Sequence, residues 1–93
     1  MARKLRLKLI QQLVEDDDKF IRMRLAINAY APLEILKKLA EDEDAWVRAA
    51  VARSRFTPID LLKNLAGDKD EKVRRDVLRN SNTPEEVRKQ LKS

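Results

Sequence analysis

The stretch that decides the fold is Thr57–Asn80, TPIDLLKNLAGDKDEKVRRDVLRN. Apolar residues recur three and four positions apart in both of its halves, which is the spacing of a helix that buries one face. An acidic break at Asp68–Asp70 separates the two halves. Nothing in the stretch alternates with a period of two, and the chain holds a single glycine, so a β-hairpin has no support. The stretch therefore predicts two short helices in a wholly α-helical protein.

Residues at the ends of these two helices predict where each one begins. We expect Thr57 to be the N-cap of the first helix, Pro58 to be its first helical residue, and Gly67 to follow its end. The second helix should begin after an aspartate that accepts hydrogen bonds from the N–H groups two and three residues further on. The aspartates in this position are Asp18, Asp44 and Asp70.

The same two-helix pattern recurs through the chain at intervals of 26 residues, a signal that outranks any single motif. Prolines mark it at 32, 58 and 84, although Arg6 stands where the first proline would fall. Arg88 replaces the leucines at 36 and 62, so the last helix should present a polar outer side and cap the stack. The predicted single domain is 1–93, with units at approximately 6–31, 32–57 and 58–83 and a C-terminal capping helix at 84–93.

The shared pattern of these units, TPxxLLxxLAxDxDxxVRxxVxR, resembles the leucine-rich repeat variant family, a relative of the HEAT-like repeats. The similarity covers nearly all of the 93 residues. It implies a short right-handed α-solenoid (a superhelix) of about three and a half two-helix repeats, and a binding scaffold rather than a catalyst. One member of that family carries an iron–sulfur cluster on a cysteine segment. This chain has no cysteine, so that cofactor does not transfer.

Composition narrows the function classes. The chain holds 21 Lys and Arg against 16 Asp and Glu, a net charge of +5, which permits an acidic partner but does not by itself imply nucleic acid. Histidine and cysteine are both absent, which removes disulfides, the usual zinc ligands and the ordinary general base at neutral pH. No glycine-rich phosphate loop or nucleophile motif occurs. We therefore expect no enzyme, no catalytic residue and no cofactor.

The acidic runs at 15–18 and 41–44 raise the question of a metal site. They lack the central glycine and the final carboxylate of a calcium-binding loop, so we expect helix caps and partners for arginines instead of a metal. No apolar run is long enough for a secretory signal or a membrane span. The expected location is the cytoplasm, without membrane contact.

An arginine recurs where the second helix of each unit should be apolar. At about 100° per residue, Arg48 falls inside the arc that Val47 and Val51 define. A buried cation is costly unless it is paired, and the aspartate six residues upstream supplies one carboxylate per unit for its own or a neighbouring arginine. A planar guanidinium suits such a bidentate pair, so we favour a structural role over an anion or nucleic-acid site. The predicted arginine ladder consists of Asp16, Arg22, Asp42, Arg48, Asp68 and Arg74.

The opposite sector of the second helices is apolar at one end of the chain and cationic at the other. If this sector is open to solvent, its apolar part is a contact surface. The alternative is that neighbouring helices bury it. Ala49 and Ala50 share the sector in the middle unit. The predicted partner-binding residues are Phe20, Met23, Ile27, Trp46, Arg53, Lys72, Arg75 and Arg79.

Two functions remain open. The favoured one is a protein-interaction scaffold for an acidic amphipathic protein or peptide, or for a second copy of the chain through the N-terminal end with Leu5, Leu7 and Ile10. The alternative is a nucleic-acid binder that contacts phosphates. Acidic runs interrupt the basic stretches, and aromatic residues are 4% of the chain, which leaves few platforms for stacking bases. The basic residues of this alternative are Arg53, Arg55, Arg75 and Arg79 and, at the start, Arg3, Lys4, Arg6 and Lys8.

Overall fold

The computed structural model describes residues 2–93, and Met1, the first residue of the predicted domain, lies outside the described residues. Within this range the chain forms seven helices and no strand, so the prediction of a wholly α-helical protein is confirmed. The helices are α1 (Ala2–Leu13), α2 (Lys19–Ala26), α3 (Leu33–Leu39), α4 (Ala45–Arg53), α5 (Ile59–Leu65), α6 (Glu71–Arg79) and α7 (Glu85–Lys92).

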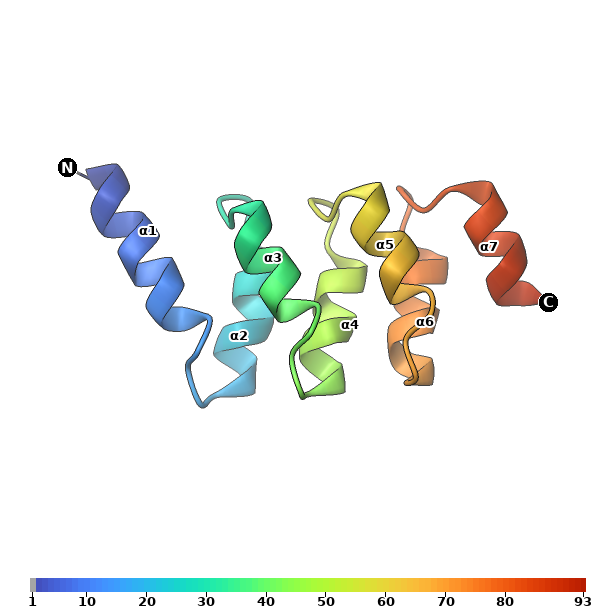
Figure 1. Ribbon diagram of the computed structural model, residues 1–93, viewed down its shortest axis with the longest axis horizontal. Coiled ribbons are helices and arrows are strands. Elements are labelled where there is room, and N and C mark those ends of the chain that lie inside the picture. Colours follow the sequence, from blue (N-terminus) through green and yellow to red (C-terminus); the bar gives the residue numbers. More distant parts are fainter. Residues whose placement is uncertain (1) are drawn as a thin grey trace.

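The helices lie in two rows along the longest axis of a molecule that measures 48 × 23 × 14 Å (Figure 1). The even row consists of α2, α4 and α6, with α4 packed closely against both of the others. The odd row consists of α1, α3, α5 and α7, which pack mainly on the even row and much less on one another. The even row is therefore the close-packed side, and the odd row is the more open side.

The hydrophobic core lies between the two rows. Its largest fully buried side chains come from both of them: Leu39, Val47, Val51, Leu62, Val73 and Val77. The middle helix α4 is buried from residue 47 to residue 52 because it has an even-row neighbour on each side. Three of those six residues are alanines, and such small side chains permit close approach of the neighbouring helices.

The even-row helices begin as predicted, each after a capping aspartate. The side chain of Asp18 accepts a hydrogen bond from the N–H of Phe20 at 2.9 Å, and the Asp44 side chain accepts one from the N–H of Trp46 at 2.7 Å. Asp70 repeats the contact with the N–H of the residue two positions on, at 2.9 Å. Each bond satisfies an N–H that the first turn of the helix leaves without an intrahelical partner.

The odd-row helices begin differently from the prediction. Pro58, not Thr57, is the N-cap of α5, and it makes no side-chain capping bond because proline has no side-chain acceptor. The Thr57 hydroxyl is buried and donates to the carbonyl of Val51 at 2.6 Å, and Thr83 does the same to the carbonyl of Val77. The threonine therefore serves the end of the preceding even helix, whose last carbonyls lack intrahelical donors.

Gly67 follows the end of α5, as predicted, since it comes directly after the C-cap residue Ala66. It does not have the positive φ of the left-handed cap that favours glycine after a helix. Instead α5 ends on Ala66 in right-handed geometry, and the N–H of Gly67 donates to the carbonyl of Asn64 at 3.1 Å. A tight turn carries the chain into the acidic loop without a reversal of backbone handedness.

Arg88 in α7 does not present the polar outer side that was predicted. It is half-buried; its Nη2 donates to the carbonyl of Asn80 at 2.8 Å, and its Nε is buried without a partner among the described residues. Its place in the pattern, which leucine fills in α3 and α5, is a buried one. The last helix therefore carries a half-buried arginine that is only partly hydrogen-bonded.

Candidate functional site

Two arginines of the even row each reach forward to an aspartate in the loop before the next even helix. Arg22 in α2 donates from Nε to Oδ2 of Asp42 at 2.8 Å and from Nη2 to Oδ1 at 3.3 Å. Arg48 in α4 repeats both distances with Asp68. In each pair the carboxylate lies twenty residues further along the chain. Of the two partners allowed by the sequence, each of these arginines pairs with the neighbour's aspartate and not its own.

The third nitrogen of each arginine reaches back to the loop before its own helix. Arg48 Nη1 donates to the carbonyl of Asp42 at 2.7 Å and to that of Glu43 at 3.2 Å, and Arg22 Nη1 donates to the carbonyl of Asp16. Asp42 therefore serves two arginines, one through its carboxylate and the other through its carbonyl. Hydrogen bonds run without interruption from α2 to α6.

The two ends of this ladder are incomplete. Arg74 in α6 donates from Nη1 to the carbonyl of Asp68 at 2.7 Å, but its Nε and Nη2 have no hydrogen-bond partner in the described part of the chain. At the other end, the Asp16 carboxylate accepts a bond from the N–H of Asp18 at 2.8 Å, and no arginine of residues 2–93 forms an ion pair with it.

Hydrogen bonds within the inner pairs favour the charged forms of their side chains in spite of burial. Arg48 is only 8% exposed. Its hydrogen bond to Asp68 raises the pKa of Arg48 despite the opposing effect of burial, and the bond to Asp42 does the same to the pKa of Arg22. Burial acts to raise the pKa of Asp68, but hydrogen bonds from Arg48 and from a backbone N–H outweigh it and hold that pKa below its usual range. These shifts favour the charged forms of Arg48 and Asp68, so loss of one partner strands a partly buried charge.

The predicted partner-binding residues include two exposed aromatic rings on neighbouring even helices. Phe20 is 63% exposed in the first turn of α2, and Trp46 is 48% exposed in the first turn of α4. A lysine lies over each ring: Lys19 Nζ is 5.7 Å from the centre of the Phe20 ring, and Lys72 Nζ is 4.9 Å from that of Trp46. Both distances are within the range of a cation–π contact.

The predicted face is not a continuous open strip. Ile27 is exposed, but Met23 is half-buried and packs on the core, and Ala49 and Ala50 are fully buried. A helical wheel shows which side of one helix is opposite the core, but it does not show the helices on either side. Here α2 and α6 cover the middle of α4.

The cations at the other end of the face are partly neutralised. Arg53 lies 3.8 Å from Asp76, Arg75 lies 3.2 Å from Glu71, and Lys72 also bonds to an aspartate. Arg79 is exposed and makes no ion pair among the described residues. The net field at this end is therefore weaker than the count of arginines in the sequence indicates.

Asp76 is a titratable residue that the sequence did not single out as a candidate. Burial raises its pKa, and the nearby Arg53, Arg79 and Arg75 only partly offset that effect. The 3.8 Å approach of Arg53 counts as an ion pair but includes no hydrogen bond, which is why it fails to compensate burial. The sequence could have indicated this burial, because Asp76 lies 26 residues after Ala50, which is fully buried.

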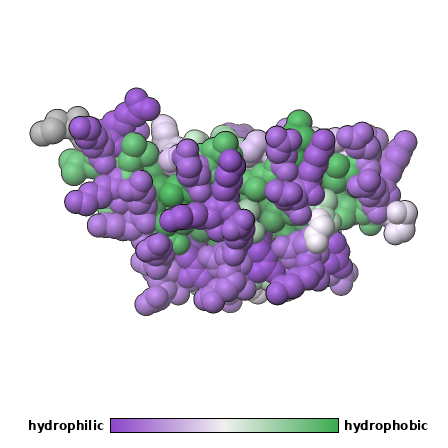
Figure 2. All heavy atoms as spheres, in the orientation of Figure 1, coloured by the Kyte–Doolittle hydropathy of each residue, from purple (hydrophilic) through white to green (hydrophobic). Residues whose placement is uncertain are grey.

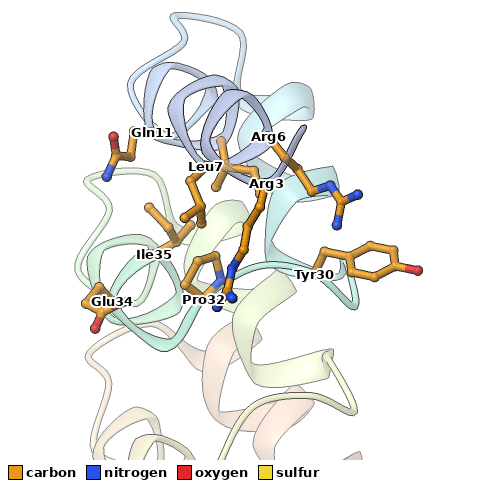
Figure 3. Close-up of a pocket in the computed structure, with 9 residues that line it drawn as sticks. Arg3, Arg6, Leu7, Gln11, Tyr30, Pro32, Glu34 and Ile35 are labelled. Carbon is orange, nitrogen blue, oxygen red and sulfur yellow. The ribbon is translucent and has the colours of Figure 1, made fainter. Parts of the chain in front are cut away.

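A groove between α1 and α3, with a volume of about 520 Å³, is a feature that the sequence did not indicate (Figure 3). Its apolar floor includes Leu7, Pro32 and Ile35. Arg6 lies over the exposed ring of Tyr30, with its guanidinium carbon 5.3 Å from the ring centre. The aromatic residue thus acts as a platform for an arginine of the basic N-terminus.

The N-terminal leucines divide between surface and core. Leu5 is 65% exposed and Leu7 is 38% exposed, as a contact surface requires. Ile10, however, belongs to the hydrophobic core, so its assignment to a self-association surface is wrong. It packs in the core and also lines the groove between α1 and α3.

Surface hydropathy follows the two rows. In the view of Figure 2, hydrophilic residues cover the lower edge, where the acidic loops before α2, α4 and α6 lie, and hydrophobic residues show in the gaps along the odd row. One such gap, between α3 and α5, is a groove of about 600 Å³ that includes Leu33, Pro58 and Leu61. The spacing of the odd helices leaves Leu33 and Pro58 exposed, whereas Leu61 is buried.

Further features of the described residues bear on the function classes. Residues 2–93 contain no cluster of three or more acidic side chains arranged to hold a metal ion. In the same range no helix has the length and apolar character needed to cross a bilayer. Comparison of the chain with protein-family models, curated proteins and solved structures gives no match.

Proposed function

We propose that this protein is a non-catalytic helical-repeat scaffold that binds another protein or peptide. In this proposal the chain is a short right-handed α-solenoid of about three and a half 26-residue units, related to the leucine-rich repeat variant family. Support comes from the helix starts, at residues 19, 45 and 71 in the even row and at 33, 59 and 85 in the odd row after α1. The lack of histidine and cysteine supports the non-catalytic part.

The observation that carries the proposal is the pair of exposed aromatic rings of Phe20 and Trp46. Both rings lie in first turns of neighbouring helices on the close-packed row, so the backbone beneath them is firmly held. Large aromatic side chains on rigid elements are typical anchors of protein interfaces, where one desolvated ring often contributes most of the binding energy.

The surroundings of the rings favour an acidic amphipathic helix as partner. Lys19 and Lys72 lie over the two rings, and Arg53 is exposed at the far end of α4. Leucines of a helix can cover the rings while its carboxylates meet these cations. Nucleic acid is the weaker candidate because aromatic residues are only 4% of the chain, which leaves few platforms for stacking bases.

The test uses Trp46, the only tryptophan, as a fluorescent reporter. The probe is a synthetic helix of about five turns with leucines on one face and glutamates beside them. Because Trp46→Ala removes this reporter, its affinity is measured with a fluorescently labelled form of the same peptide. The substitution should weaken affinity at least about tenfold. Tyr30→Ala, which removes an exposed aromatic ring at the odd row, is the matched control and should leave affinity unchanged.

Two outcomes would contradict the proposal. If single-stranded DNA binds at low salt, dissociates at moderate salt and ignores Trp46→Ala, the face binds phosphates and the alternative function holds. If the peptide with lysines in place of glutamates binds equally well, charge plays no part in partner choice. The remaining candidate partner is a second copy of the chain. Sedimentation of the wild type and of Trp46→Ala tests it, because a dimer that forms through this face should become monomeric in Trp46→Ala.

A further inference from the structure

Arg74 holds a guanidinium in a fixed place without using all of its donors. Its Nη1 donates to the carbonyl of Asp68 at 2.7 Å, as Arg48 Nη1 donates to the carbonyl of Asp42 at the same distance. Nε and Nη2, which bind a carboxylate in the two inner arginines, have no partner among residues 2–93. An anchored guanidinium loses little further side-chain entropy when a ligand binds, which favours binding.

The inner pairs show which ligand this arrangement accepts. The carboxylates of Asp42 and Asp68 each receive Nε at 2.8 Å and Nη2 at 3.3 Å from an arginine. The same carboxylates also accept the N–H of the residue two positions on, at 2.9 Å, and that second residue is the aspartate that caps the next even helix. The ligand is thus an Asp-x-Asp turn at the start of a helix, and the chain contains two complete examples.

The surface beside Arg74 has room for such a turn and helix. Figure 1 shows α7 at the end of the odd row, with no even-row helix beyond α6. Leu78 and Leu91 are half-buried there, whereas their counterparts Ala52 and Leu39 are fully buried beneath a further even helix. A cleft of about 290 Å³ between α6 and α7 is lined by Glu71, Arg74, Arg75, Leu78 and Leu91.

Of the two arginines that line this cleft, only Arg74 has no carboxylate partner among residues 2–93. Arg75 bonds to Glu71 at 3.2 Å, one turn away on the same helix, so these two charges offset each other. Arg74 has no such partner, and its free edge carries the two donors that match a carboxylate in geometry. The cleft therefore combines one oriented cation with two accessible leucines.

We propose that Arg74 and the cleft between α6 and α7 bind a helical segment of a partner polypeptide that begins with an Asp-x-Asp turn. The first aspartate completes the hydrogen bonds of Arg74 in the way Asp42 completes those of Arg22. The apolar side of the following helix covers Leu78 and Leu91. This site is separate from the face with Phe20 and Trp46, so it stands whether or not that face binds a partner.

The test follows the arginine Nε signals of the ¹⁵N-labelled 93-residue protein by NMR. The probe is a synthetic amidated peptide with the sequence of residues 41–53, EDEDAWVRAAVAR, which carries the turn and the helix that follows it. The Nε signals of Arg22 and Arg48 mark the carboxylate-bound state. On addition of millimolar peptide, the Arg74 Nε signal should move towards these two, and the methyl signals of Leu78 and Leu91 should shift.

Matched variants separate this site from general charge attraction. Arg74→Ala, or a peptide with asparagine in place of its first aspartate, should weaken binding at least about tenfold. Lys89→Ala, which removes an exposed cation from α7, should change affinity less than about twofold. The proposal is overturned if the Arg74 signal does not move at millimolar peptide, or if Arg74→Ala and Lys89→Ala weaken binding equally.

Discussion

Arg48 in the middle of the even row and Arg74 at its end occupy equivalent places but have different surroundings. Both donate to a backbone carbonyl in the loop before their own helix, at 2.7 Å. Of the two, only Arg48 also holds a carboxylate, because within residues 2–93 α4 is followed by another acidic loop and even helix and α6 is not. The hydrogen bond to the carbonyl therefore needs only a helix and the loop before it, whereas the ion pair also needs the loop before the next even helix.

The largest expected effect is that of Arg48→Ala, which should lower the free energy of unfolding by about 2–4 kcal/mol. It leaves the Asp68 carboxylate and the Asp42 carbonyl without a partner in a partly buried place. Arg74→Ala strands no carboxylate and should cost less. Arg53→Ala, at the exposed end of α4, should change stability by less than about 0.5 kcal/mol. Urea unfolding followed by circular dichroism measures all three.

Two results would break the comparison. Equal losses for Arg48→Ala and Arg53→Ala would mean that the inner side of α4 has been misassigned. Equal losses for Arg48→Ala and Arg74→Ala would mean that the carbonyl anchor contributes all of the stability and the ion pair none.

The next largest effect concerns Asn80, which ties the end of α6 to the end of α4. Its buried Nδ2 donates to the carbonyls of Ala52 at 2.8 Å and Ser54 at 3.0 Å. Asn80→Ala should lower the free energy of unfolding by about 1–3 kcal/mol, since it leaves buried carbonyls without this donor. Asn28→Ala is the control, because Asn28 is exposed and only accepts a bond from the N–H of Tyr30. Similar losses for the two variants would contradict this role of burial.

A smaller effect of opposite sign is expected at Arg88. Arg88→Leu removes a buried Nε without a partner and restores the residue that α3 and α5 have at this place. The carbonyl of Asn80 loses one donor but keeps the N–H of Thr83 at 3.1 Å. The free energy of unfolding should rise by about 0.5–1.5 kcal/mol. A thermal or urea melt checks this, and a clear loss of stability would show that the arginine is a favourable cap.

The smallest expected effect depends on pH. The pKa of Asp76 is raised in the folded state by burial, so its ionised form destabilises the fold at pH values above that raised pKa. Asp76→Asn should therefore stabilise the protein at pH 7, by less than about 0.5 kcal/mol. The gain should vanish as the pH falls below the pKa of an unfolded aspartate, about 3.9, where Asp76 is protonated in both states. If the stabilisation by Asp76→Asn increases as the pH falls, the prediction is wrong.

The sequence predicted what depends on short-range pattern. The all-helical class follows from the apolar spacing, and the capping aspartates Asp18, Asp44 and Asp70 follow from their place before each even helix. The arginine inside an apolar arc also pointed correctly to a buried, bonded side chain at Arg48. These features need only residues that are close in the chain or recur at one interval.

What the sequence did not predict depends on competition between partners. The Thr57 hydroxyl could cap α5, but it donates instead to the carbonyl of Val51 at the end of α4, which also accepts the N–H of Ser54. Arg88 bends inward because the carbonyl of Asn80 lies within its reach, which no helical wheel reveals. Ala49 and Ala50 are covered by helices that are distant in the chain. In each case the outcome is set by a neighbour whose position the local pattern does not contain.

The double use of Asp42 has a consequence for how the protein can change length. Its carboxylate accepts hydrogen bonds from Arg22, which precedes it in the chain, and its carbonyl accepts one from Arg48, which follows it. Asp68 accepts bonds from Arg48 and Arg74 in the same way. A deletion of residues 42–67 would bring Asp68 into the place of Asp42, where it would offer Arg22 the same carboxylate and keep its own carbonyl for Arg74. An insertion of one more such segment would add one arginine–aspartate pair of the same kind. The bonding rule is thus independent of the number of segments, which allows a gene to gain or lose them by simple duplication or deletion.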